Sequence, residues 1–311
     1  MTKQLLLIDG NSIVFRAFFA MHNQMDKFTN KDGLHTAAIY GFKLMLDHVL
    51  QNFKPDTALV AFDAGKVTFR TKMYDDYKGG RNKTPNELTE QIPYVRELIK
   101  DSGLHSYELA NYEADDIIGT LAKQADDAGY KTLIVTGDRD LTQLASENTT
   151  VAVTHKEHYT PAHVEEKLGI TPRQIIDMKA LMGDSSDNYP GVTKIGEKTA
   201  IKLVKQFGSV EELYDHIDDL KKSKMKEHLI EDEEIARQCK TLATILRDAP
   251  LKIGLDDLQY QGPQTDDLIK FYKEMGFKSF LKKMDIDGAG EEDEAEIAPI
   301  DYTVLTKDNL D

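Results

Sequence analysis

Three apolar stretches decide the fold of this chain: QLLLID at residues 4–9, TALVAFD at residues 57–63 and KTLIVTGD at residues 131–138. Each is short, rich in Leu, Ile and Val, and without helical periodicity, which is typical of a strand buried on both faces. A helical pattern over residues 37–52 lies between the first two, and a fourth strand is plausible at residues 149–155. Strands that alternate with helices predict an α/β fold, with a mostly parallel central sheet flanked by helices.

The character of the chain changes after about residue 170. Helical patterns punctuated by glycines dominate residues 171–284, where we expect a smaller helical subdomain beside an α/β core at residues 1–170. Residues 285–297 are acidic and lack aromatic side chains, which favours a solvated linker. Residues 301–305 read as the beginning of a strand, so residues 285–311 are interpreted as a linker and the start of a following domain.

Net charge, apolar stretches and cysteine content limit the classes of protein to which the chain can belong. The net charge is −15, but residues 285–311 hold ten acids and one lysine, so the first 284 residues carry only −6. Nucleic-acid binding is therefore not excluded, because phosphate contacts depend on local basic patches. No stretch approaches the roughly 20 apolar residues of a membrane span, and a single cysteine, Cys239, fits a reducing compartment. We expect a cytoplasmic protein without membrane association, and nothing indicates more than a monomer.

An aspartate follows each of the three strands: Asp9, Asp63 and Asp138. One such residue is an ordinary turn or cap residue, but the carboxyl ends of parallel strands meet at one edge of a sheet. Asp140 lies two residues after Asp138, where an extended chain points both side chains the same way. These four carboxylates are expected to share one crevice.

Two further acidic groups are candidates for the same crevice. Glu113, Asp115 and Asp116 open a helical pattern that runs to residue 128, although acids also favour a helix N-terminus for its dipole. Asp184 and Asp187 lie in a glycine-bounded turn, which alone is more often structural. So many carboxylates would repel one another unless cations neutralise them. An all-oxygen set favours Mg²⁺ or Mn²⁺ over zinc, and two such ions suit hydrolysis of a phosphodiester.

Basic residues and aromatic rings alternate in residues 66–83, which hold six basic residues, two acids and three aromatic rings. On a helix, five of them would form one stripe able to hold phosphates and stack on bases: Arg70, Tyr74, Tyr77, Lys78 and Arg81. The alternative is a solvated amphipathic helix, and Gly79–Gly80 could break the helix before its end.

The second basic patch is GVTKIGEKTA at residues 191–200. Gly191 and Gly196 are five apart and precede a helix start, as in a helix–hairpin–helix turn, where backbone amides bind phosphate. Lys194 and Lys198 would add positive charge. Such a turn reads the nucleic-acid backbone and not its sequence.

Seven sequence motifs of the chain resemble those of a known family. LLLIDGNS, VAFDA, FR…YKGGR, NYEADD, TGDRDLTQL, GDSSDNYPGV and KIGEKTA occur in the order found in bacterial 5′–3′ exonucleases and flap endonucleases, over residues 1 to about 284. The resemblance implies a PIN-like 5′ nuclease core, a helical arch at about residues 66–95 and a helix–three-turn–helix at about residues 183–208. It also implies two or more Mg²⁺ ions, for which Mn²⁺ can substitute, and a K⁺ ion at the helix–three-turn–helix.

The resemblance further assigns site residues. It implies that nine acids bind metal directly or through water: Asp9, Asp63, Glu113, Asp115, Asp116, Asp138, Asp140, Asp184 and Asp187. Asp115 is expected between the ions, with Asp9, Asp63 and Glu113 on one side and Asp138, Asp140 and Asp187 on the other. Lys78 and Arg81 match catalytic residues on the scissile phosphate, and Tyr77 matches one that stacks on a nucleotide. The implied DNA contacts are Phe69, Arg70, Tyr74, Tyr77, Lys78, Arg81, Gly191, Lys194, Gly196 and Lys198.

The expected function is hydrolysis of phosphodiesters near 5′ single-strand/duplex junctions, on DNA flaps, nicks, 5′ ends and RNA primers, in replication and repair. Such an enzyme is nucleoid-associated, and the resemblance extends to the nuclease region of bacterial DNA polymerase I, in which polymerase domains follow. Three alternatives are a ribonuclease of a related acidic-site type, a non-catalytic junction binder and a phosphomonoesterase. The ribonuclease would lack the basic and aromatic stripe of the arch and the KIGEKTA turn. The junction binder would lack some of the carboxylates. The phosphomonoesterase would have a second acid on the first strand.

Overall fold

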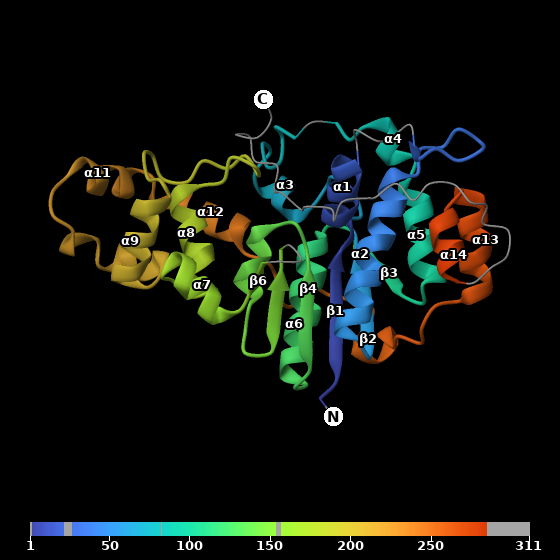
Figure 1. Cartoon of the computed structure of the whole chain (residues 1–311). Coiled ribbons are helices and arrows are strands. Elements are labelled where there is room, and N and C mark those ends of the chain that lie inside the picture. Colours follow the sequence, from blue (N-terminus) through green and yellow to red (C-terminus); the bar gives the residue numbers. More distant parts are fainter. Residues whose placement is uncertain (1, 22–26, 82, 154–156, 285–311) are drawn as a thin grey trace.

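A six-stranded sheet forms the centre of the molecule. The computed structural model describes residues 2–21, 27–81, 83–153 and 157–284. The strands are β1 (Gln4–Asp9), β2 (Thr57–Ala61), β3 (His105–Tyr107), β4 (Lys131–Val135), β5 (Thr149–Ala152) and β6 (His158–Tyr159). Their order is β3-β2-β1-β4-β5-β6, with every pair parallel except β5 and β6 (Figure 1). The predicted α/β fold with a mostly parallel sheet is confirmed.

The two faces of the sheet are covered by different helices. Side chains alternate along each strand, so Leu6 and Ile8 of β1 join one core, whereas Leu5 and Leu7 join the other. The first core is closed by helices of the N-terminal half and by two from the end of the chain: α1 (Gly10–Met21), α2 (Ala37–Phe53), α5 (Ile92–Asp101), α13 (Thr265–Met275) and α14 (Lys278–Lys283). The second core is covered by α6 (Ala114–Asp127) and by the helical lobe.

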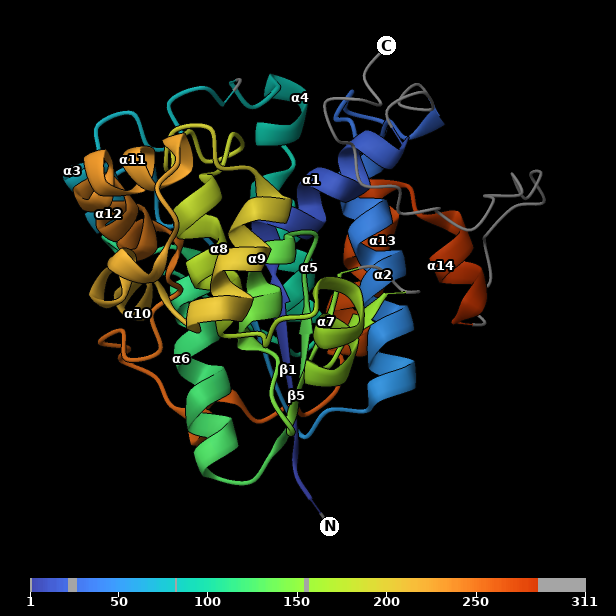
Figure 2. The same cartoon turned by 90° about the vertical axis from the view of Figure 1, so that its left-hand side faces the viewer.

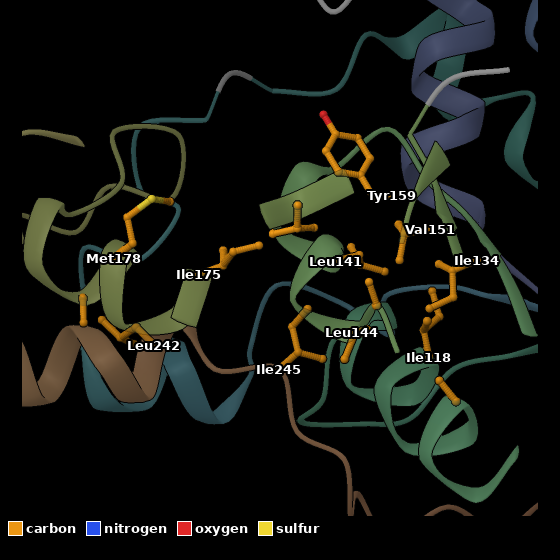
Figure 3. Close-up of a cluster of buried hydrophobic side chains, with 14 of the residues drawn as sticks. Ile118, Ile134, Leu141, Leu144, Val151, Tyr159, Ile175, Met178, Leu242 and Ile245 are labelled. Carbon is orange, nitrogen blue, oxygen red and sulfur yellow. The ribbon is translucent and has the colours of Figure 1, made fainter. Parts of the chain in front are cut away.

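The helical lobe extends from the β5–β6 side of the sheet (Figures 1 and 2). It consists of α7 (Pro161–Leu168), α8 (Gln174–Met182), α9 (Glu197–Phe207), α10 (Val210–Asp215), α11 (Lys224–Glu231) and α12 (Glu233–Ala243), with a 3-10 turn, η3 (Ile217–Asp219). A second 3-10 turn, η2 (Arg139–Leu144), joins the lobe to the sheet. In Figure 3, Leu141 and Leu144 of η2 lie between Ile134 of β4 and Ile175 of α8. Sheet and lobe therefore share one continuous core.

The last two helices do not belong to this lobe. Residues 171–284 were expected to form one helical subdomain, but α13 and α14 pack on α5 and α2, on the opposite side of the sheet (Figures 1 and 2). Their aromatic rings cause this arrangement, since Phe277 and Phe280 lie 5.2 and 4.9 Å from the ring of Tyr40 on α2. A third 3-10 turn, η4 (Leu255–Leu258), lies on the path back from the lobe.

The segment at residues 66–83 is not a single helix. Helix α3 covers only Phe69–Met73, and the backbone of Tyr74 is extended. Turns follow, with Lys78 in the left-handed region at φ 57°, before the short helix α4 (Asn86–Thr89). The expected one-stripe helix is therefore wrong, because the helix ends at Met73, and Tyr77 and Lys78 follow in turns, with Arg81 after them, outside its register.

Three predictions concern less regular regions. The fourth strand is confirmed at Thr149–Ala152, while the end of its expected range falls on residues 154–156, outside the described residues. The linker and the strand expected within residues 285–311 also lie outside them. Among the helices that the structure describes, none combines the length and apolar character needed to cross a bilayer.

Candidate active site

The carboxyl edge of the sheet collects the acids that follow its strands. Asp9 is the last residue of β1, and Asp63 and Asp138 come shortly after β2 and β4. In Figure 1 this edge is uppermost, and the segment from α3 to α4 runs above it. The amide of Ala114, the first residue of α6, donates to Asp63 at 2.8 Å. The start of α6, with Glu113 before it, is thus fixed beside the strand ends.

Thr136, at the end of β4, links the first and fourth strands. Its hydroxyl donates to Asp9 Oδ2 at 2.8 Å and accepts from the amide of Asp138 at 2.9 Å. Asp138 Oδ1 in turn accepts from the amide of Asp140 at 2.8 Å. These bonds bring Asp9, Asp138 and Asp140 into one group.

The hydroxyl of Tyr77 bridges the core and the helical lobe. It lies 3.2 Å from Glu113 Oε2 and 3.1 Å from Asp187 Oδ2. Lys78 donates to Glu113 Oε1 at 2.7 Å, and Arg81 to Asp187 Oδ1 at 2.6 Å. Two acids far apart in the sequence therefore share Tyr77 as a neighbour, and each also pairs with its own cation, Glu113 with Lys78 and Asp187 with Arg81.

Lys179 of α8 connects an acid that follows β4 with an acid of the helical lobe. Its ammonium donates to Asp140 Oδ1 at 2.7 Å and also contacts Asp184. Asp184 Oδ1 lies 3.4 Å from the amide of Asp187. A continuous series of contacts thus runs from Asp138 through the lobe to Glu113. The predicted acids of the sheet edge and those of the helical lobe therefore belong to one connected group.

Burial and charge raise the pKa values of three of these carboxyls: Asp9, Asp140 and Asp115. Burial, together with the charges of Asp63 and Asp138, raises the pKa of Asp9 to about 7, against the hydrogen bonds from Ser12 and Thr136. Burial and the charge of Asp138 raise the pKa of Asp140 to about 7, although Lys179 opposes them.

Asp115 belongs to the same electrostatic group. Burial and the charges of Asp9, Asp138 and Glu113 raise its pKa well above the ordinary value, and Lys78 offsets only part of this. Burial opposes the charge of Lys78, but Glu113, Asp187 and Asp115 raise its pKa. The site therefore has more negative charge than its lysines and arginines compensate.

Hard divalent cations fit this donor set by its chemistry. The donors are all carboxylate oxygens, the preferred ligands of Mg²⁺ and Mn²⁺, and the raised pKa values reflect charge that a cation would neutralise. Among the described residues, no three acids, histidines or cysteines lie close enough to enclose one ion as the side chains are placed. Lys78 and Lys179 hold Glu113, Asp140 and Asp184 instead, so a shared ion requires these side chains to turn.

Two expected site residues have another role in the structure. Asp116 is fully buried and Arg70 is 2% exposed, and they form a two-pronged ion pair with both N–O distances at 2.8 Å. Neither side chain has room for the metal ion or the DNA that was expected to contact it. The reason is helical geometry, because successive residues on α6 point about 100° apart, so Asp116 faces Arg70 beneath the site and not the acidic group.

The aromatic side chains of this segment are also less accessible than expected. Tyr77 is 4% exposed, with its ring in the core and its hydroxyl on the acids, so its face is not available for stacking in this structure. Phe69 and Tyr74 are half-buried. Lys78 lies at the site, and Arg81 is at its rim with a side chain that is 51% exposed.

The glycine turn presents its lysines to solvent. Gly191 has φ 65° and packs against Gly183, where an added Cβ would lie 2.2 Å from the Gly183 amide nitrogen. Helix α9 begins after Gly196, with Lys194 and Lys198 exposed beside its N-terminus. The glycine turn and the helix start after it lie where the sequence placed them, and phosphate binding by this turn stays a prediction.

The sequence reasoning missed Lys179 and Thr136. Lys179 has a detectable signal, since it is a lone cation in the apolar run Met178–Met182 and would need an acidic partner once buried. Thr136 has none, because a threonine at a strand end is an ordinary residue.

Comparisons with known proteins agree with this geometry. The family described as "5'-3' exonuclease, N-terminal resolvase-like domain" matches residues 4–169, and "5'-3' exonuclease, C-terminal SAM fold" matches residues 170–266. The chain belongs to the 5′-3′ exonuclease family. It is therefore a nuclease that acts on 5′ ends, as the resemblance implied.

The relatives of this 5′-3′ exonuclease are longer proteins. It is 55% identical to DNA polymerase I of Streptococcus pneumoniae (strain ATCC BAA-255 / R6) over 99% of this chain and 35% of the relative. It is 50% identical to DNA polymerase I of Bacillus subtilis over 98% of this chain and again 35% of the relative. The chain thus spans about a third of the length of the curated relatives it matches.

Solved structures show the same fold. T5 5′-exonuclease with bound zinc ions covers 88% of this chain with 99% of its own, at 24% identity and a TM-score of 0.67. The catalytic core of Rad2 in complex with DNA substrate covers 88% of this chain with 87% of its own, at 16% identity and a TM-score of 0.56.

Proposed function

We propose that this 5′-3′ exonuclease cuts phosphodiesters near junctions between a 5′ single strand and a duplex, including flaps, nicks and RNA primers, with two or more Mg²⁺ ions. The observation that carries this proposal is the series of contacts that brings acids of the sheet and of the helical lobe together beside Lys78 and Arg81. Mn²⁺ is expected to substitute, because its ligand preferences are similar.

The acids hold the ions in this proposal. Asp9, Asp63, Glu113, Asp138, Asp140, Asp184 and Asp187 surround the site, with Asp115 central among their charges. When bound, such cations lower the pKa of a coordinated water and stabilise the leaving oxygen. No Ser, Cys or His is then needed as a nucleophile.

Lys78 and Arg81 would bind the phosphate that is cut. Both side chains pair with acids at the site, Lys78 with Glu113 and Arg81 with Asp187, and would exchange these partners for the phosphate when the acids hold metal. Their positive charges then offset the charge that develops on the phosphate in the transition state. Tyr77 keeps Glu113 and Asp187 together through its hydroxyl, so stacking on a nucleotide would require this buried ring to move.

The helical lobe would hold the duplex. Among the described residues, no side chain caps the N-terminus of α9, so its first backbone amides can bind a phosphate, and Lys194 and Lys198 lie exposed beside them. A K⁺ ion held at this turn would add positive charge for binding a DNA phosphate. Because the contacts are to the backbone, recognition is of structure and not of sequence.

The proposed setting is replication and repair in the cytoplasm, at the nucleoid, with the chain acting as a monomer and followed by polymerase domains. The similarity to about a third of DNA polymerase I supports the last point. The non-catalytic alternative predicts that some of these acids are missing. Every acid in the series of contacts from Asp138 to Glu113 is present in the sequence.

The test is cleavage of a labelled 5′-flap DNA beside a blunt duplex of the same sequence, in Mg²⁺, in Mn²⁺ and in excess chelator. We expect cleavage near the junction with either metal, little cleavage of the blunt duplex, and none in chelator. Equal cleavage in chelator would overturn the metal assignment. Equal cleavage of both substrates would overturn the junction specificity.

A further inference from the structure

Arg70 is the largest fully buried side chain of the described residues, and every one of its donors is satisfied. Nε donates to the carbonyl of Leu242 at 3.0 Å, and one Nη2 bond of 2.6 Å reaches the carbonyl of Thr244. The remaining bonds reach Asp116, at 2.8 Å to each oxygen, and Glu113 Oε2 at 3.0 Å. Five hydrogen bonds for five N–H groups leave no donor for a phosphate.

The partner carboxylate is equally occupied. Asp116 Oδ2 also accepts from the amide of Glu113 at 3.1 Å, which fixes the residue just before α6. Asp116 Oδ1 also accepts from the amide of Leu246 at 3.0 Å. The Arg70–Asp116 pair therefore joins three backbone segments: α3, the start of α6, and residues 242–249, which comprise the last two residues of α12 and the chain that follows it and which we call the return segment.

Hydrogen bonds fix the return segment to both α6 and η2. Thr120 of α6 accepts from the amide of Ala249 at 3.0 Å. Gln143 of η2 accepts from the amide of Ile245 at 2.9 Å and donates to the carbonyl of Ala243 at 3.0 Å. At Gly119, a Cβ would lie 2.5 Å from the carbonyl oxygen of Leu246, so the segment rests directly on α6.

The helix before the return segment belongs to the lobe. Helix α12 packs along α8, which carries Lys179 and leads to the turn with Asp184 and Asp187. The lobe is therefore connected through the return segment to the start of α6, where Glu113 and Asp115 lie.

We propose that Arg70 is a positioning residue that locks the first turn of α6, and hence Asp115 and Glu113, to the return segment of the helical lobe. A planar guanidinium is needed for this, because only it can hold a carboxylate at two points and two carbonyls at the same time. Arg70 thus aligns the acids of the core with those of the lobe and does not touch nucleic acid.

The deciding variant is Arg70→Lys, which keeps the charge but cannot form the planar set of bonds. Arg237→Lys is the matched control, since the Arg237 ion pair with Glu233 lies within α12. Three quantities are measured in both: hydrogen exchange of the return-segment amides, the salt dependence of 5′-flap DNA affinity with Ca²⁺ in place of Mg²⁺, and kcat and KM for flap cleavage in Mg²⁺.

Loss of the lock predicts exchange at the Leu246 amide that is faster by about 10-fold, the effect of losing about one hydrogen bond. It also predicts a kcat lower by about 100-fold, as for a displaced catalytic group, with little change in KM and an unchanged salt slope. If Arg70 contacts a phosphate instead, Arg70→Lys should preserve kcat. In that case Arg70→Met, which removes the charge, should lower the slope of log DNA affinity against log salt by about one. Either of those results would overturn the proposal.

Gln143→Leu tests the proposal if neither Arg70 variant folds. Gln143 is a second tether of the return segment, and its side-chain hydrogen bonds go to the backbone of Ala243 and Ile245 and not to an acid. We expect faster exchange at Ile245 together with a kcat lower by about 10-fold. Faster exchange with an unchanged kcat would show that the segment does not position α6. The kcat readout rests on the proposed function, whereas exchange does not, so failure of cleavage in the wild type is distinguishable from failure of the lock.

Discussion

Replacing Asp9 with asparagine is expected to stabilise the metal-free protein while it removes a metal ligand. Asp9 is 5% exposed, and its carboxylate accepts from the Ser12 amide and the Thr136 hydroxyl, neither of which is a cation. Its pKa is about 7 in the folded chain and about 3.9 when unfolded. An asparagine can keep the bond from Ser12 and donate to Thr136.

The sign follows from proton linkage. The folded state keeps the proton on Asp9 up to about pH 7, whereas the unfolded state releases it near pH 4, so stability falls as the pH rises between these values. Above pH 7 the loss from this one carboxyl amounts to about 4 kcal/mol, and about 2 to 3 kcal/mol of it arises between pH 5 and pH 8. Asp9→Asn removes this dependence.

The assay is urea unfolding of wild type and Asp9→Asn in excess chelator at pH 5 and pH 8. We expect the variant to be more stable at pH 8 by about 2 to 4 kcal/mol, with a smaller advantage at pH 5. Added Mg²⁺ should raise the stability of the wild type more than that of the variant, because only binding to the folded state stabilises it. A variant that is no more stable than the wild type at pH 8 would refute the reasoning.

Three further predictions concern the lobe. Lys179→Met leaves the buried Asp184 and the half-buried Asp140 without their cation, so metal-free stability at pH 8 should fall by about 3 kcal/mol and Mg²⁺ should restore more of it than in the wild type; equal urea midpoints in chelator would contradict this. Gly191→Ala places a Cβ against the Gly183 backbone at positive φ, and we expect a loss of about 3 kcal/mol or more in urea unfolding, so a loss below about 1 kcal/mol would count against the turn geometry. Changing both Lys194 and Lys198 to Gln should reduce the slope of log affinity against log salt for flap DNA by about 2, and an unchanged slope would exclude these lysines as phosphate contacts.

The strands and their acids were predictable because the signals are local. An apolar run that ends in an aspartate specifies both the strand and the edge where the carboxylate lies, as for Asp9 and Asp138. Strand β3 was missed because it is three residues long at the sheet edge, with His105 and Ser106 exposed. No buried run marks it.

The roles of neighbouring residues were less predictable, because they depend on partners from distant parts of the chain. Asp115 and Asp116 are equivalent in the sequence, but Asp116 is neutralised by Arg70, 46 positions earlier. Arg70 in turn reads as a surface cation in a basic segment until α3 ends and the guanidinium is enclosed by the return segment. Spacing alone indicates a stripe on a helix and carries no information about where the helix stops.

The most direct test of the account is the number of Mn²⁺ ions that the chain binds, measured by the loss of the free Mn²⁺ electron paramagnetic resonance signal. The acids that meet beside Asp115 predict at least two ions per wild-type chain in the range of two-metal sites, and weaker binding or fewer ions for Asp115→Asn. Binding of no ion, or identical binding by Asp115→Asn, would contradict the claim that these acids together form a metal site.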